Sequence, residues 1–195
     1  MKIRTALIGI SLTIAFAAAT WAQNGPGYRN RNLNRNPDCR TCTSSTSLQE
    51  LGDPEIVALF YMREEEKLAM DVYTALYQKW ELSIFSNIAE SEERHFDAIG
   101  TLIARYGLDD PAQSEPGIFS NQEIQDLYDG FIAEGIGSIG SALDVGVAIE
   151  NKDIEDLRNA ISATDNPDIL SVYGNLLNGS YNHLAAFNSY QEVVD

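Results

Sequence analysis

The feature that most constrains this chain is the position of its only two histidines. His95 and His183 each end a run in which the residue three positions earlier would share one face of a helix. In the first run that residue is Glu92, which gives Glu-x-x-His, and in the second it is Ser180. Carboxylate-bridged di-iron and di-manganese sites in four-helix bundles use this pattern, so the first run predicts a helical metal site. Ser180 departs from it, because a hydroxyl is a poor ligand for such metals and is better suited to hydrogen-bond a bound water.

The chain from residue 53 onward has the apolar spacing of helices and no convincing alternating strand. Asp53 before Pro54 predicts a helix start with Asp53 as the N-cap, and Gly107 predicts a helix end. We therefore expect an all-α four-helix bundle with a long central crossover that carries a short extra helix. The predicted helices span about residues 53–80, 84–106, 121–133, 138–162 and 165–190.

The first 22 residues have the features of a secretory signal peptide. Lys2 and Arg4 precede an apolar stretch over residues 6–19, and Thr20 and Ala22 are small residues at the two key positions before a cleavage after Ala22. An uncleaved membrane anchor is the alternative. We expect a mature protein that is secreted or periplasmic and has no membrane contact after cleavage.

Residues 23–50 are rich in Asn, Arg and Ser and predict a disordered linker, whereas residues 51–190 predict the helical bundle. The linker carries Cys39 and Cys42 in a C-x-x-C pattern. In an oxidising compartment this pair favours a local disulfide, and a tethered metal or redox role is the alternative.

Acidic residues dominate the predicted bundle. The chain has a formal net charge of −16, and 27 of its 29 Asp and Glu residues lie in residues 51–195. Such a domain repels phosphate backbones, which makes nucleic acid a poor partner. The charge can serve solubility, and it can also attract cations toward a carboxylate site.

The first predicted helix carries three consecutive glutamates. Glu66 is in phase with Met62 and Tyr73, so we expect it to face the core. Glu64 is expected on the solvent side, and Glu65 is the fallback ligand because a small rotation would bring it inward. The alternative is that the whole run is a solvated acidic face.

The other long helices also place metal-binding groups on their apolar faces. His95 is in phase with Ile99, although a lone histidine there can also be an ordinary core residue. Glu150 and Asp153 share a face, with the alternative that Asp153 interrupts the helix as an N-cap. The sequence therefore predicts one metal site from all four long helices, formed by Glu66, Glu92, His95, Glu150, Asp153 and His183.

Several of these segments resemble known proteins. Glu66, Ala69 and Tyr73 are spaced as in the first helix of rubrerythrin-type ferritin-like proteins, and Glu92 with His95 is similar to their second-helix motif. More closely, the chain from about Leu51 to Phe187 resembles the ferritin-like domain-of-unknown-function family 2202. The resemblance rests on Arg63–Ala69, Phe85–Ala89, Glu92–His95, Thr164–Asn166 and Asn175–His183. It implies a ferritin-like bundle and does not supply a reaction.

Three functions are compatible with the sequence. The first is a di-iron or di-manganese oxidoreductase that acts on O2 or peroxide, in which Tyr73 donates hydrogen bonds or electrons or is simply a core aromatic. Two cysteines cannot form a four-thiolate iron site, so electrons would come from an external donor. The second is a metal-binding or storage module without turnover, and the third is a metal-free helical interaction protein. A homodimer is compatible with each.

Overall fold

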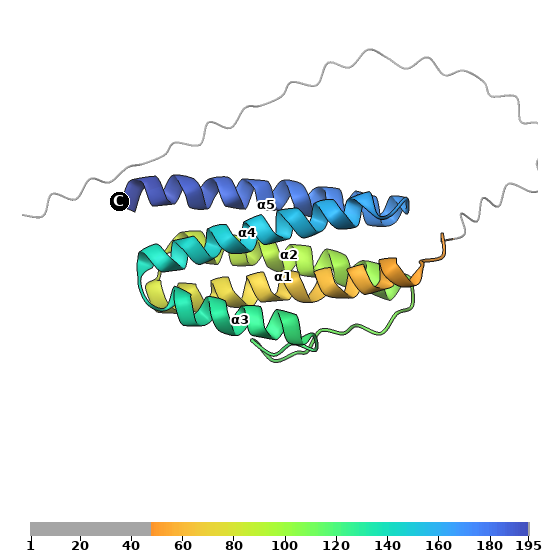
Figure 1. Ribbon diagram of the computed structural model, residues 1–195, viewed down its shortest axis with the longest axis horizontal. Helices are drawn as coiled ribbons and strands as arrows, with labels where there is room; N and C mark the ends of the chain where they lie inside the picture. Colours follow the sequence, from red (N-terminus) through yellow and green to blue (C-terminus); the bar gives the residue numbers. More distant parts are fainter. Residues whose placement is uncertain (1–47, 195) are drawn as a thin grey trace, which may run out of the picture. The chain divides into compact units, whose positions relative to one another are not determined.

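The computed structural model describes residues 48–194, and all of their regular structure is helical (Figure 1). This confirms the predicted all-α bundle. The proposed signal peptide and the Cys39–Cys42 linker lie outside the described residues. The helices are α1 (Asp53–Trp80), α2 (Ser83–Arg105), α3 (Gln122–Gly135), α4 (Ile139–Ser162) and α5 (Pro167–Val194).

The four long helices form two pairs. α1 packs mainly on α2, and α4 packs mainly on α5, while α1–α4 and α2–α5 contacts join the pairs (Figure 1). The short helix α3 lies in the crossover between α2 and α4 and contacts both α1 and α4. The bundle therefore has the predicted arrangement of four long helices and one extra helix. No helix in residues 48–194 combines the length and the apolar character needed to cross a membrane.

Local capping interactions set the helix ends close to their predicted positions. The predicted N-cap Asp53 was wrong, because Asp53 is the first residue of α1 and Gly52 is the N-cap. The N–H of Gly52 donates to Glu55 Oε2 at 2.8 Å. Gly107 ends α2 with φ +67°, a conformation that glycine adopts without strain. The Asn166 side chain accepts the N–H of Asp168 at 3.0 Å and so caps α5.

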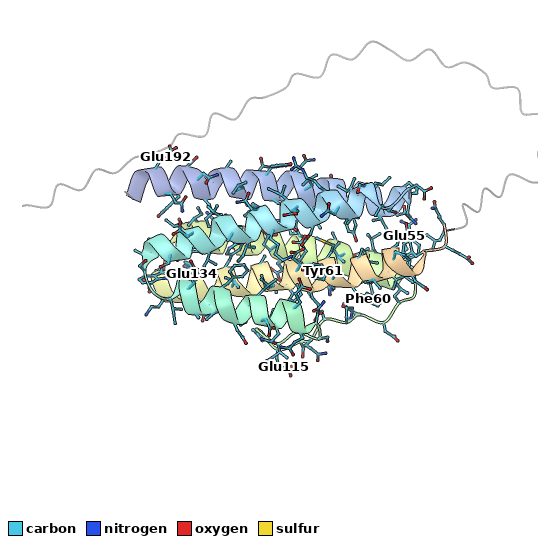
Figure 2. The ribbon with its side chains drawn as sticks, viewed as in Figure 1. Glu55, Phe60, Tyr61, Glu115, Glu134 and Glu192 are labelled. Carbon is cyan, nitrogen blue, oxygen red and sulfur yellow. The ribbon has the colours of Figure 1, made fainter. Side chains whose placement is uncertain are left out.

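Two apolar clusters fill the bundle, and one polar layer separates them. The Phe85 cluster includes Tyr73, Phe85, Ile149 and Phe187, and the Ile103 cluster includes Leu59, Ile103, Leu157 and Tyr173. Along each long helix the polar residues fall between the members of the two clusters, and side chains fill the space between the ribbons (Figure 2). We call this the central polar layer; it consists of Glu66, Glu92, His95, Glu150, Asp153, Ser180 and His183.

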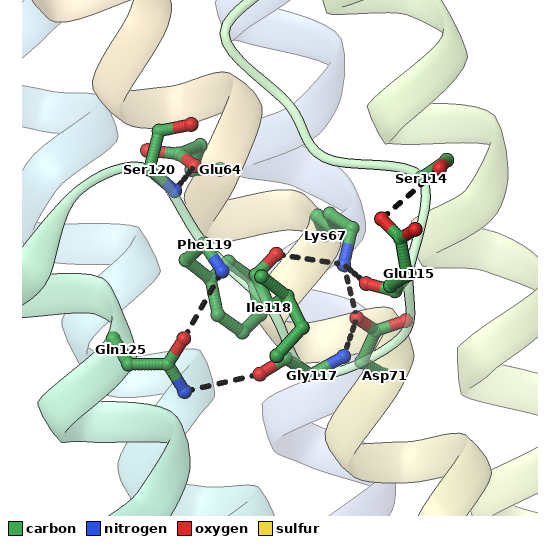
Figure 3. Close-up of polar contacts among 10 residues, drawn as sticks. All are labelled: Glu64, Lys67, Asp71, Ser114, Glu115, Gly117, Ile118, Phe119, Ser120 and Gln125. Carbon is green, nitrogen blue, oxygen red and sulfur yellow. Dashed lines mark hydrogen bonds and ion pairs between the residues drawn. The ribbon is translucent and has the colours of Figure 1, made fainter.

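The crossover before α3 is fixed to α1 by buried charged side chains (Figure 3). The Lys67 ammonium lies 2.6 Å from Asp71 Oδ2, which also accepts the N–H of Gly117 at 2.9 Å. Glu64 accepts the N–H of Asn121 at 2.9 Å and is only 3% exposed. The prediction that Glu64 faces solvent was therefore wrong, because the crossover covers that face of α1.

Replacement of Asp71 tests this anchoring. Asp71→Ala leaves the Lys67 ammonium buried without its carboxylate, so we expect the free energy of unfolding to fall by about 3–5 kcal/mol in urea denaturation. Asp109→Ala is the matched control, because Asp109 is an exposed residue of the same crossover. Equal, small effects of the two substitutions would show that the ion pair does not hold the crossover.

Candidate metal centre

The four long helices bring all six predicted ligands into the central polar layer. α1 supplies Glu66, α2 supplies Glu92 and His95, α4 supplies Glu150 and Asp153, and α5 supplies His183. The carboxylates are 1–6% exposed, and the imidazole side chains are 13% and 10% exposed. The interpretation of residues 64–66 as a solvated acidic run was wrong, because all three glutamates are buried.

Glu92 connects the two histidines. Its Oε2 lies 2.7 Å from His95 Nδ1, and its Oε1 lies 2.8 Å from His183 Nδ1. The two imidazole rings stack with their centroids 5.5 Å apart and their planes 29° apart. One carboxylate thus presents an oxygen to each ring.

The ligand atoms form two groups that share Glu92. Glu66, Glu92 and His95 form one group, and Glu92, Glu150 and His183 form the other. Within each group the three ligand atoms lie within 4.8 Å of one another. Carboxylate oxygens and imidazole nitrogens are the donors that iron and manganese take in helical bundles.

The short distances from Glu92 to the two histidines are those of ion pairs and lack the geometry of hydrogen bonds. The two Nδ1 atoms and Glu66 Oε1 are buried and have no hydrogen-bond partner among the described residues. A buried polar atom without a partner costs about 1–3 kcal/mol. A cation between the converging atoms would remove that cost, so the residues present fit a bound metal.

Asp153 lies beside these groups and belongs to neither of them. It accepts a hydrogen bond from the Ser180 hydroxyl through Oδ2, while its buried Oδ1 has no partner among the described residues. The alternative that Asp153 is an N-cap was wrong, because α4 continues unbroken through it. Its role as a ligand stays a prediction.

Tyr73 orients a ligand carboxylate from the Phe85 cluster. Its hydroxyl donates to Glu150 Oε1 at 2.7 Å, and its ring packs against Phe85 and Phe187. The hydrogen bond expected from Tyr73 is therefore donated to Glu150. Sequence analysis missed this partner, because the two residues are 77 positions apart.

Burial and charge contacts have opposite effects on the pKa values in the central polar layer. Burial opposes ionisation of Glu92, yet close contacts with His183 and His95 outweigh it and lower the pKa of Glu92. Burial likewise disfavours the imidazolium of His95, but contacts with Glu66 and Glu92 raise its pKa to about 10. Burial raises the pKa of Glu66 and of Glu150. Metal binding would therefore displace protons from this layer.

The fold and the layer define a class: an all-helical bundle with a buried carboxylate and imidazole centre. Residues 55–194 match the family described as an uncharacterized protein domain, DUF2202. The chain belongs to this family, which confirms the resemblance seen in the sequence. The likeness to rubrerythrin-type proteins stays a prediction.

Two proteins illustrate the similarity. The uncharacterized protein MJ0754 of Methanocaldococcus jannaschii is 48% identical over 145 residues, which are 74% of this chain and 78% of that protein. A crystal structure of hypothetical protein MJ0754 has a TM-score of 0.75 and 46% identity, covering 77% of this chain and 87% of that one. A DUF305 fragment from Deinococcus radiodurans shares the fold alone, at a TM-score of 0.55 and 11% identity over 74% of this chain and 99% of that one.

Gly179 provides a test of the packing around His95. A Cβ at this position would lie 2.6 Å from His95 Nε2, so Gly179→Ala must displace the ring. We expect Gly179→Ala to lower the free energy of unfolding by about 1–3 kcal/mol in urea denaturation.

Gly174→Ala is the matched control on the same helix, because a Cβ there meets nothing within 4 Å. It should stabilise α5 by about 0.5–1 kcal/mol. If both substitutions stabilised the protein equally, His95 would not be held against α5 as described.

Proposed function

We propose that this chain is an exported protein that binds two metal ions, iron or manganese, in the central polar layer. The shared position of Glu92 supports this proposal, since one carboxylate faces both Nδ1 atoms. Glu66 and His95 would hold one ion, Glu150 and His183 would hold the other, and Glu92 would contribute to both sites. Asp153 is the nearby carboxylate that could replace the glutamate absent at Ser180.

The surrounding residues suit redox chemistry on a small molecule. Bound iron or manganese would supply the electrons for reduction of O2 or peroxide. Tyr73 fixes Glu150 through its 2.7 Å hydrogen bond, which is how an outer residue orients a metal ligand. The Phe85 and Ile103 clusters keep water from both ends of the layer. An external donor would return electrons to the bound ions.

Metal content measured by mass spectrometry tests the proposal. Protein purified from its export compartment without a tag or chelator should carry about two iron or manganese ions per chain. Glu92→Gln should lose both ions because it belongs to both groups, whereas Glu66→Gln should lose mainly one. Glu93→Gln is the matched control, since this exposed neighbour on α2 should leave the metal content unchanged.

The alternatives give different results in the same experiment. A wild-type protein without metal, with unchanged folding of Glu92→Gln, would indicate a helical interaction protein. Stable metal binding without consumption of peroxide or O2 would indicate a binding or storage module. Retention of both ions by Glu92→Gln would contradict the assignment of Glu92 to both sites.

A further inference from the structure

A second set of buried charges lies next to the central polar layer, between α1 and α4. Glu65 of α1 has a side chain that is 4% exposed, and neither of its oxygens has a hydrogen-bond partner among the described residues. Its nearest cation is the Lys152 ammonium of α4, 3.2 Å from Oε1. A carboxylate this deeply buried requires a positive charge close to it.

Lys152 covers Glu65 from the solvent side. Its side chain is 27% exposed, and its ammonium also contacts the Tyr61 hydroxyl at 2.7 Å and the Asp156 carboxylate. Tyr61 lies on the part of α1 that faces α4 (Figure 2). We call Tyr61, Glu65, Lys152 and Asp156 the α1–α4 seam; it runs from a partly exposed carboxylate to a buried one.

Asp153 connects the α1–α4 seam with the central polar layer. Asp153 directly follows Lys152 on α4. Glu66 directly follows Glu65 on α1, so each helix passes from the seam to the layer within one residue. Asp153 Oδ1 is a further buried oxygen without a hydrogen-bond partner among the described residues. Carboxylates therefore occur at three depths: Asp156 is partly exposed, Glu65 is buried in the seam, and Asp153 is buried in the central polar layer.

We propose that the α1–α4 seam is the route by which divalent cations reach the centre, with Glu65 as the intermediate ligand and Lys152 as the occupant they displace. This inference rests on the proposed metal-binding function. The Lys152 ammonium already occupies the place of a cation beside Glu65. Because the Lys152 side chain is partly exposed, it can rotate into solvent. The strongly acidic surface raises the local concentration of cations at the outer end.

The test is the rate at which the metal-free protein takes up Co²⁺, followed by its visible absorption in a stopped-flow instrument. Glu65→Gln should slow uptake about tenfold, a barrier change of about 1.4 kcal/mol, without changing the final number of ions. Lys152→Met should speed uptake, because the occupant is gone. Glu155→Gln is the matched control, since Glu155 is exposed on α4 and its replacement removes the same charge.

The outcomes separate this inference from the proposed function. Unchanged uptake by Glu65→Gln and Lys152→Met would overturn the route while leaving the metal centre intact. Loss of a bound ion in Glu65→Gln would also overturn it, since Glu65 would then be a ligand of the centre. A wild type that binds no Co²⁺ would overturn both proposals. If circular dichroism shows that Glu65→Gln does not fold, the result for Lys152→Met decides the question. Faster uptake by Lys152→Met would support the route, and unchanged uptake would overturn it.

Discussion

The contact of one buried carboxylate with two imidazoles determines how this bundle is organised. Glu92 presents one oxygen to His95 on its own helix and the other to His183 on α5. α2 and α5 must therefore keep a fixed register and rotation. The close approach of Gly179 to the His95 ring enforces the same register from the opposite side. Metal binding is thus proposed at the point where all four long helices meet.

Burial of this layer lowers the stability of the fold, and apolar burial in the rest of the bundle offsets that loss. Each buried ion costs several kcal/mol after relaxation, whereas a fully buried large apolar side chain contributes about 1.5–3 kcal/mol. The Phe85 and Ile103 clusters supply that apolar burial on both sides of the layer. Two ion pairs lie outside the layer: Lys67 with Asp71 holds the crossover, and Lys152 with Glu65 joins α4 to α1 within the seam.

Local features of the sequence predicted most of the helices. Gly107 and Asn166 act on their own helix ends, and helical periodicity placed Glu66 and His95 on inner faces. The burial of Glu64 could not be predicted, because it depends on where the distant crossover returns to α1. The contacts of Tyr73 with Glu150 and of Lys152 with Glu65 also join residues far apart in sequence, so helical phase alone gives no indication of them.

Anomalous X-ray diffraction from crystals grown with Mn²⁺ tests the central claim most directly. We expect two anomalous peaks in the central polar layer, one beside Nδ1 of His95 and one beside Nδ1 of His183, with Glu92 between them. A layer without peaks at saturating Mn²⁺, or a single ion that does not contact Glu92, would contradict it.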